Sequence, residues 1–518
     1  MNLFHKQIRH LLLALALVAI SGGMWAQDNT TPVPTPPDQS TQGPDLSGAP
    51  PAATGGAGEP SMENPPVTGL DSPRSEPAFG GRSYLVPGLQ LSESASTNVS
   101  GSTGSGGISA VSQGLGSLDL QKIWKRYAVG VDYIGGGDYY TGPTSNGQGH
   151  AYQVHTLASD QRILWRTGQL SIRDNFDYLP EGTFGFGSVG GAGGFGSVLG
   201  GISGIGTGLG GGIAGGTPVG LYGSGSFGSV GFEPRIDNAA IVDITQELSA
   251  RSTVTAGGSF DYTEFLDKSR TEFPVINSQQ SSFQAGYNRL LGRSDQIGVL
   301  YAFQEFHFPQ AGSGSLSAQV WNAVYAHRIT GKLNFVIGGG PQLVDVHNPA
   351  ITFFLFGIFP ITIPASTTRN ITGNASATLN YTVSSRTSAQ VLYQRFISPG
   401  SGFLPGANTN AVRASVSHVF KQRWTGVGDA GYSFNSALHN ASSTTGVNAR
   451  AYQYWYLGGS LRRQLSPHFD VFASYQFNDF GAHACQATTV NTSVCGHRAT
   501  RQTGMIGIDW RPRPIRLD

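Results

Sequence analysis

The sequence predicts an all-β fold, a transmembrane antiparallel up-and-down β-barrel of about 18 strands behind a disordered Pro-rich N-terminal segment. Three observations predict it: a recurring pair of an apolar and a basic residue, alternating side chains on both sides of each pair, and a shortage of charged residues. Alternation with a period of two is typical of a strand whose two faces meet different surroundings.

Eight times along the chain an apolar residue is followed three positions later by a basic one, between two runs of alternating side chains. The pairs are Ile123/Arg126, Ile163/Arg166, Leu248/Arg251, Leu290/Arg293, Ile329/Lys332, Val383/Arg386, Phe420/Arg423 and Leu465/His468. Most successive pairs are about 40 residues apart, which is room for a hairpin and one longer loop. Eight short turns, with both chain ends on one side, predict nine hairpins and therefore 18 strands, within a plausible range of about 16 to 18.

The composition favours a chain whose outer surface meets hydrocarbon. Charged residues make up 12% of it, whereas soluble domains carry roughly 25%. Neutral polar residues and Gly fill the gap, as strands between lipid and water require. The net charge of +1 and the lack of a basic stripe argue against a nucleic-acid-binding protein.

The first 26 residues are predicted to be a secretory signal peptide. Lys6, Arg9 and His10 precede the apolar run 11–20, and small residues then lead to Ala26. The run is too short to span a membrane, and a polar stretch follows it. An uncleaved anchor is the alternative. No apolar run of about 20 residues occurs after residue 26, so a membrane-embedded mature chain must cross as strands.

Residues 27–80 are predicted to be a disordered periplasmic tether rich in Pro, Gly and Ser. They hold Pro-Pro at 36–37, 50–51 and 65–66 and hardly any periodic apolar residue. Such a segment buries too little surface to offset its ordering entropy. In a second interpretation the tether reaches the cell wall or a periplasmic partner.

Residues 81–518 are predicted to form the barrel. In residues 424–435 an apolar set points one way while Thr425, Asp429 and Ser433 point the other, and 371–381 and 469–478 show the same split. One face of each strand is therefore expected to meet lipid and the other water. A soluble β-propeller or solenoid is the alternative, but its blades should carry four short strands per repeat rather than two long runs.

The last strand is predicted over about 498–510, with Ile506, Ile508 and Trp510 outward. Residues 82–518 thereby resemble the outer-membrane β-barrel porins of double-membraned bacteria, in architecture rather than in an exact motif. The resemblance implies an outer-membrane location, with lipid, lipopolysaccharide and the barrel-assembly machinery as partners, and a homo-oligomer is in keeping with it. Porins typically end on an aromatic residue; here Trp510 is in the corresponding strand, and residues 511–518 follow it.

Two external loops have unusual compositions. Residues 182–231 are Gly-rich and are expected either to narrow the lumen or to form a mobile surface loop. Their Gly runs lack the context of a nucleotide site. Residues 348–366 contain an apolar run interrupted by Pro360, which is too short for a spanning helix. We expect it to pack in the barrel mouth, between subunits or against lipid, with a ligand-binding apolar mouth as the alternative.

The two cysteines, Cys485 and Cys495, are predicted to form a disulfide in the last external loop, 481–497. Oxidising conditions outside the inner membrane favour their pairing, which would contribute roughly 2–4 kcal/mol. His483 and His497 flank them, but the short spacing of a zinc knuckle is missing, so no metal site is predicted.

Eight charged side chains are candidates for the lining of the lumen. They are Arg173, Asp177, Asp261, Arg413, Asp429, Asp470, Arg501 and Asp509. Opposed acidic and basic walls would focus a field across a pore and set its ion preference. The alternative is a structural role in pairing neighbouring strands, and a register shift of one residue would reverse every assignment.

The sequence predicts a non-enzymatic protein without a cofactor, since no hydrolase-type serine elbow and no His-Glu-x-x-His motif lies in a suitable context. An 18-stranded barrel is wider than its side chains can fill. The predicted function is therefore a porin-like channel for passive diffusion of small polar solutes. The alternatives are the outer-membrane exit pore of a polysaccharide or secretion export system, and a structural or adhesive surface barrel.

Overall fold

The computed structural model describes thirteen stretches of the chain. They are residues 83–98, 107–141, 151–179, 234–266, 276–309, 314–348, 350–355, 359–400, 404, 406–421, 423–438, 449–485 and 498–517. All regular structure in them is β, and no helix among them is long and apolar enough to cross a membrane. The predictions for residues 1–26, 27–80 and 182–231 lie outside the described residues.

The first part of the barrel consists of eleven consecutive antiparallel strands. They are β1 (Tyr84–Thr97), β2 (Ile108–Ile123), β3 (Tyr127–Thr141), β4 (Ala151–Trp165), β5 (Gly168–Leu179), β6 (Arg235–Ser249), β7 (Ser252–Phe265), β8 (Ser278–Leu290), β9 (Asp295–Phe308), β10 (Gly314–Thr330) and β11 (Leu333–Asn348). Each pairs with the next along the chain. The connectivity is that of an up-and-down meander.

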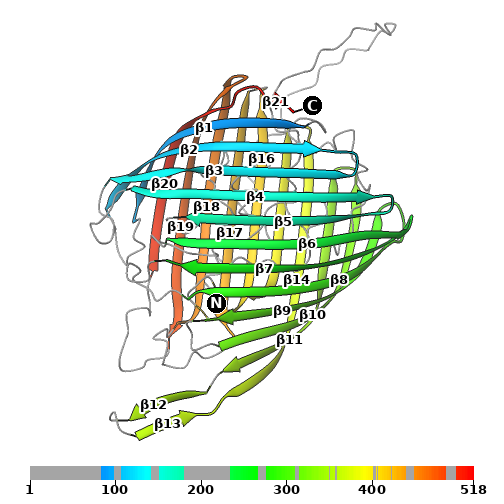
Figure 1. Cartoon of the computed structure of the whole chain (residues 1–518), viewed down its shortest axis with the longest axis vertical. Coiled ribbons are helices and arrows are strands. Elements are labelled where there is room, and N and C mark those ends of the chain that lie inside the picture. The colour runs from blue at the N-terminus through cyan, green and yellow to red at the C-terminus, as the bar shows by residue number, and fades with distance from the viewer. Residues whose placement is uncertain are drawn as a thin grey trace, which may run out of the picture. The chain divides into compact units, whose positions relative to one another are not determined.

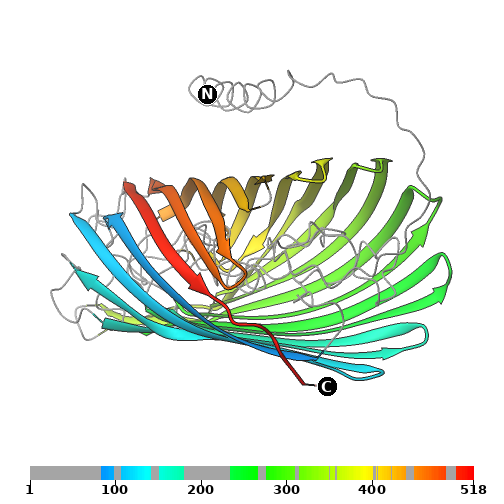
Figure 2. The ribbon, with the colours of Figure 1, turned by 90° about the horizontal axis from the view of Figure 1, so that it is seen from above.

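The second part continues with seven more strands. They are β14 (Ser366–Ser384), β15 (Thr387–Ser398), β16 (Ala407–Phe420), β17 (Trp424–Ala437), β18 (Ala449–Ser466), β19 (Phe469–Cys485) and β20 (Arg498–Trp510). β14 pairs with β11, so the meander is unbroken. Figure 1 shows β1–β9 crossing in front of β14–β19, and Figure 2 shows these two parts of the wall on opposite sides.

The ends of the meander pair with each other and close the barrel. β1 and β20 are antiparallel, from Leu89 opposite Trp510 to Ser96 opposite Thr503. The hydroxyl oxygens of Ser96 and Thr503 lie 3.0 Å apart across this seam. The barrel is therefore a closed ring of 18 antiparallel strands, as the sequence predicted.

The chain beyond the last barrel strand returns to the same seam. β21 (Ile515–Arg516) pairs with Tyr84 and Leu85 of β1. The residues that follow Trp510 therefore extend the pairing between the first and the last part of the barrel wall.

All eight apolar–basic pairs mark short turns. The turns consist of residues 124–126, 166–167, 250–251, 291–294, 331–332, 385–386, 421–423 and 467–468. Two barrel strands separate each of these turns from the next, so all eight lie at the same end of the barrel, which we call the turn end. The longer connections lie at the opposite end.

Side chains alternate between an exposed outer face and a buried inner face. In β9, Val299 and Tyr301 are exposed while Leu300, Ala302 and Gln304 are buried. A closed barrel has only an outside and an inside, so the buried set faces inward. The alternation predicted for 424–435 is present in β17, where Asp429 and Ser433 are buried.

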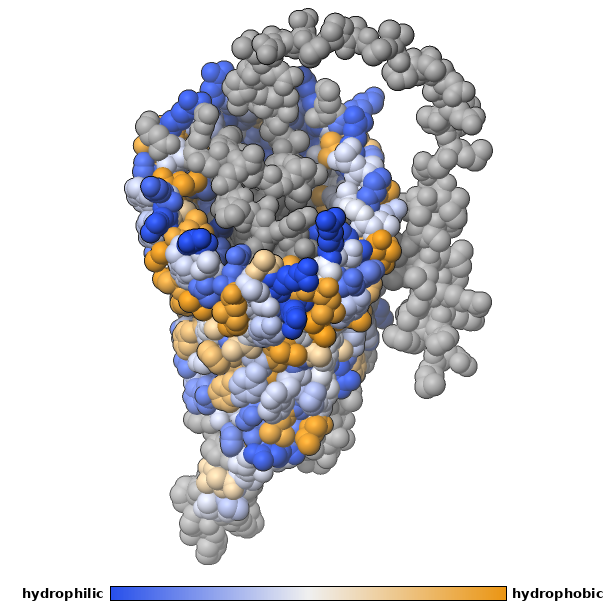
Figure 3. All heavy atoms as spheres, turned by 90° about the vertical axis from the view of Figure 1, so that its right-hand side faces the viewer, coloured by the Kyte–Doolittle hydropathy of each residue, from blue (hydrophilic) through white to orange (hydrophobic). Residues whose placement is uncertain are grey.

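The exposed face of the strands is apolar over most of its height. Exposed large apolar side chains include Leu118, Ile172, Val242, Ile244, Phe260, Phe283, Val299, Val412, Leu457, Ile506, Ile508 and Trp510. Figure 3 shows apolar residues gathered over the middle of one outer face. In β17, ten residues separate the outward Trp424 and Phe434. At about 3.4 Å per residue and a tilt of about 45°, they span about 24 Å along the barrel axis, close to the apolar band of a membrane barrel.

β2 and β3 approach each other closely at Gly114 and Gly136. A Cβ atom on Gly136 would lie 2.0 Å from the carbonyl oxygen of Gly114, which no side chain tolerates. Gly136 therefore has no room for any larger residue while the two strands keep this separation.

The apolar segment between β11 and β14 forms a hairpin of its own. β12 (Ile351–Leu355) and β13 (Phe359–Ile363) pair antiparallel in a separate two-stranded sheet. Figure 1 shows this hairpin continuing beyond the ends of β11 and β14. The expectation of a loop packed in the mouth of the barrel did not foresee these two strands.

Candidate pore lining

The inner face of the barrel divides into a charged part and a neutral part. Inward charges lie on β2–β7 and β16–β20. Apart from Arg328 beside a turn, the described inward positions of β8–β11, β14 and β15 carry no charged residue. The two parts of the inner face therefore differ in their chemistry.

Aspartates outnumber arginines on the charged part. The inward aspartates on the strands are Asp119, Asp132, Asp138, Asp160, Asp177, Asp237, Asp243, Asp261, Asp429, Asp470 and Asp509. The inward arginines on the strands of the charged part are Arg162, Arg173, Arg235, Arg413, Arg462 and Arg501. Carboxylates therefore outnumber guanidinium groups on this part of the wall by eleven to six.

Five of the six arginines are ion-paired with an inward aspartate. Arg162 contacts Asp160 at 2.6 Å, and Arg235 contacts Asp237 at 2.7 Å. Arg173 pairs with Asp243. These pairs join neighbouring residues along one strand or across two, and so fix the charged side chains against the wall.

Two of the predicted residues, Arg413 and Asp429, form one of these pairs. The guanidinium of Arg413 contacts the carboxylate of Asp429 at 2.5 Å, and the Tyr456 hydroxyl donates to the same carboxylate at 3.0 Å. Two others, Asp470 and Asp509, are joined through Arg462, which pairs with Asp470 and lies 3.3 Å from Asp509.

Of the remaining four predicted residues, Arg173 and Asp177 lie on β5, Asp261 lies on β7 and Arg501 lies on β20. Arg173 is buried against Asp243 of β6. Asp177 is directly opposite Asp237, and Asp261 is opposite Ala239. Arg501 lies at the closing seam, where it donates to the Ser96 hydroxyl at 2.6 Å. The structure therefore distributes the eight residues around the wall rather than in one cluster.

Toward the turn end, four of the inward aspartates are partly exposed. Asp119, Asp132, Asp160 and Asp470 are only partly buried on the inward side. Asp119 and Asp132 are directly opposite each other on β2 and β3. Sequence reasoning missed this acidic pair because its significance depends on the register between the two strands.

The neutral part of the wall carries buried amides among buried apolar side chains such as Leu300, Val320 and Val344. The amides are Gln280, Gln284, Asn288, Gln296, Gln304, Asn322, Gln342, Asn374 and Gln394. Three of their polar atoms have no hydrogen-bond partner among the described residues: Oδ1 and Nδ2 of Asn322, and Oε1 of Gln394. Sequence reasoning missed this wall, although the spacing of Gln280, Gln284 and Asn288 along one strand face was a readable signal.

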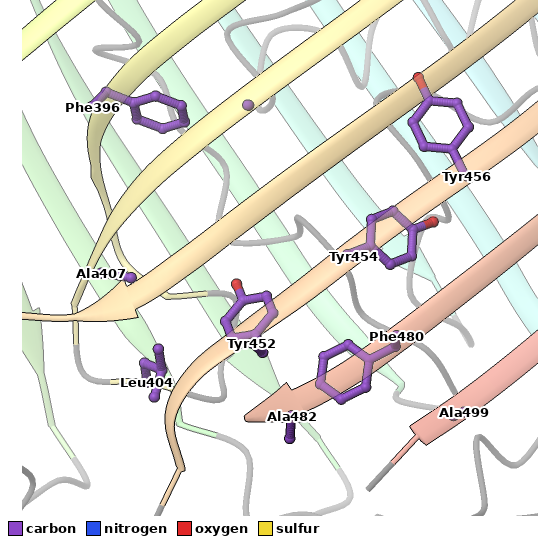
Figure 4. Close-up of a cluster of buried hydrophobic side chains, with 10 residues drawn as sticks. Phe396, Leu404, Ala407, Tyr452, Tyr454, Tyr456, Phe480, Ala482 and Ala499 are labelled. Atoms are coloured by element: carbon purple, nitrogen blue, oxygen red, sulfur yellow. The ribbon is translucent and has the colours of Figure 1, made fainter. Parts of the chain in front are cut away.

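An aromatic cluster lines the inner face of β18 near the end with the longer connections. Tyr452, Tyr454 and Tyr456 are buried in succession on the inward side, and Phe480 of β19 packs beside them. Figure 4 shows the three tyrosines following one strand. The Tyr454 hydroxyl donates to Asn478 at 2.6 Å, so the cluster combines apolar packing with satisfied polar tips.

No group of His, Cys, Asp and Glu in the described part of the chain could hold a metal ion. The predicted disulfide lies outside the described residues, because Cys495 and the side chain of Cys485 are not among them.

Comparison with known proteins gives similarity of architecture alone. No protein-family model and no curated protein matches the chain. The open form of the ferric-catecholate import receptor Fiu from E. coli K12 matches with a TM-score of 0.40 and 9% identity, over 85% of this chain and 82% of that chain. The outer membrane protein opdK from Pseudomonas aeruginosa matches with a TM-score of 0.37 and 10% identity, over 83% of this chain and 98% of that chain. The FrpB iron transporter from Neisseria meningitidis (F5-1 variant) matches with a TM-score of 0.40 and 8% identity, over 86% of this chain and 87% of that chain.

Proposed function

We propose that the chain is a porin-like channel of the bacterial outer membrane for passive diffusion of small polar solutes. One observation carries the proposal: a closed ring of 18 strands has an apolar outer face, and its inner face carries buried polar and charged side chains interspersed with apolar ones. Barrels of this size enclose more space than their own side chains fill. Outer-membrane lipid and lipopolysaccharide are the surroundings that this outer face fits.

The lining supports a preference for cations and neutral solutes over anions. Inward aspartates outnumber inward arginines, and five of the arginines are neutralised locally by ion pairs. A negative lumen raises the local concentration of cations and repels anions. The amides on the opposite wall offer donors and acceptors to uncharged hydroxylated solutes.

Single-channel recording on refolded protein in planar bilayers tests this function. We expect steady conductance, and a reversal potential in a KCl gradient that shows preference for K⁺. Replacing the facing pair, Asp119→Asn and Asp132→Asn, should move the permeability ratio toward unity. Asp174→Asn is the matched control, since Asp174 lies on the outer face beside Asn238 and should leave the ratio unchanged.

The recordings also separate this function from its alternatives. A folded barrel that stays silent, yet conducts after deletion of residues 182–231, would contradict passive diffusion and favour a plugged export pore. Conductance that needs residues 27–80 would likewise contradict a simple diffusion pore. A barrel that is silent in every form would favour a structural or adhesive role.

A further inference from the structure

The turn end of the barrel carries a belt of basic side chains. The eight turns contain Lys125, Arg126, Arg166, Arg251, Arg293, Lys332, Arg386, Lys421 and Arg423, and none of the turns contains Asp or Glu. All nine side chains are exposed. We call these nine residues the basic belt.

The belt lies directly beyond the edge of the apolar outer face. Exposed apolar side chains precede the basic residues by a few positions, as Ile163 precedes Arg166 and Leu248 precedes Arg251. Leu248 is 62% exposed although it is large and apolar. On the lipid-facing side of a membrane barrel such a side chain contacts hydrocarbon, so the basic residue just beyond it reaches the height of lipid headgroups.

Aromatic side chains mark the same height. The guanidinium carbon of Arg463 lies 5.1 Å from the centre of the Trp424 ring, and the rings of Trp124 and Tyr127 stack 5.2 Å apart. Trp and Tyr concentrate at the boundary between hydrocarbon and headgroups. The belt is therefore on the headgroup side of an aromatic girdle.

The basic belt has no anionic partner within the described chain. None of its nine side chains forms an ion pair there. At the opposite end of the barrel, Arg369 pairs with Asp345 at 2.7 Å and Arg498 pairs with Asp479 at 2.7 Å. Among the described residues, Arg369 and Arg498 at the far end are thus already neutralised, whereas the nine bases of the basic belt are not.

We propose that the basic belt binds the phosphate groups of anionic phospholipids in the membrane leaflet at the turn end. The inference rests on the membrane embedding in the proposed function but not on conduction. Successive turns at one end of an 18-stranded barrel are about 13 Å apart. Seven of the eight turns carry the nine bases, and turns 124–126 and 421–423 carry two each. The spacing between turns exceeds the Debye length of about 8 Å, so the turns act nearly independently, and each base favours an adjacent anionic headgroup about fivefold.

Electron paramagnetic resonance with spin-labelled lipids tests the belt. Refolded full-length protein is reconstituted in phosphatidylcholine bilayers containing spin-labelled phosphatidylglycerol or spin-labelled phosphatidylcholine. We expect the protein-contacting fraction to favour phosphatidylglycerol, and 0.5 M salt to weaken the preference. The variant with Arg166→Gln, Arg251→Gln, Arg293→Gln and Arg386→Gln should lose about half of the selectivity, because it removes about half of the belt.

The controls separate the belt from charge in general and from the pore. Arg369→Gln with Arg498→Gln removes two exposed but ion-paired bases, and should leave lipid selection unchanged. Equal association of the two lipids with the unmodified barrel would overturn the proposal, and so would unchanged selection in the four-residue variant. Either result would favour an acidic protein, instead of anionic lipid, as the partner of the basic belt. A silent barrel that still selects phosphatidylglycerol would refute the pore and uphold the belt.

Discussion

A lysine placed on the outer face of β16 should destabilise the barrel far more than a lysine placed one residue away on the inner face. Val416 is outward and 40% exposed, and lies near the middle of the apolar band. Ser415 is inward and directly opposite Asp429. Val416→Lys puts an ammonium into hydrocarbon, whereas Ser415→Lys puts it beside a carboxylate.

The expected cost follows from the depth of the substitution. A lysine near the bilayer midplane costs about 2–4 kcal/mol on the lipid face of a barrel. At 1.4 kcal/mol per factor of ten, this lowers the folding equilibrium constant about 30- to 700-fold. Ser415→Lys places its ammonium beside the carboxylate of Asp429 instead of in hydrocarbon, and should cost about 1 kcal/mol, the typical value for a single substitution.

Guanidinium titration in lipid vesicles, followed by tryptophan fluorescence, measures both values. Val416→Ala is the control for loss of the valine side chain without a charge. Equal costs for the two lysines would refute the assignment of outer and inner faces. A larger cost at Ser415 would mean that the register is shifted by one residue.

Two further predictions concern contacts within the wall. Arg413→Gln leaves Asp429 buried without its ion-pair partner and should lower the free energy of unfolding by about 3 kcal/mol in the same titration. An unchanged value would show that the pair is not formed. Gly136→Ala should lower the free energy of unfolding by about 1–3 kcal/mol, because the added Cβ meets backbone atoms. Gly504→Ala is the control and should be nearly neutral, because its Cβ would have nothing within 4 Å. Equal costs for the two alanines would contradict the close approach of β2 and β3.

Sequence reasoning predicted the strands and turns because their signals are local. The alternation within 424–435 and the apolar–basic pair Phe420/Arg423 can be read without knowing any partner strand. Each signal depends on a few consecutive residues that face lipid or water. The end of the last strand at Trp510 followed from the same rhythm.

The pairing of charges was predictable only within a hairpin. Arg413 and Asp429 meet across one short turn, which fixes their register. Arg173 pairs with Asp243, 70 positions away along the chain. A long connection separates β5 from β6, and no local pattern fixes the register across it. The amide wall was missed for another reason, since a neutral amide such as Gln304 attracts attention only when its neighbours in space are known.

Closure of the ring is tested most directly by a disulfide across the β1–β20 seam. Ala95 and Gly504 are opposite each other on the outer face, and a Cβ on Gly504 would meet no other atom within 4 Å. In a chain with Cys485→Ser and Cys495→Ser, the variant with Ala95→Cys and Gly504→Cys should oxidise nearly completely after refolding, and the product should migrate as a covalent loop on a denaturing gel. Free thiols at both positions in the folded protein would contradict a closed barrel.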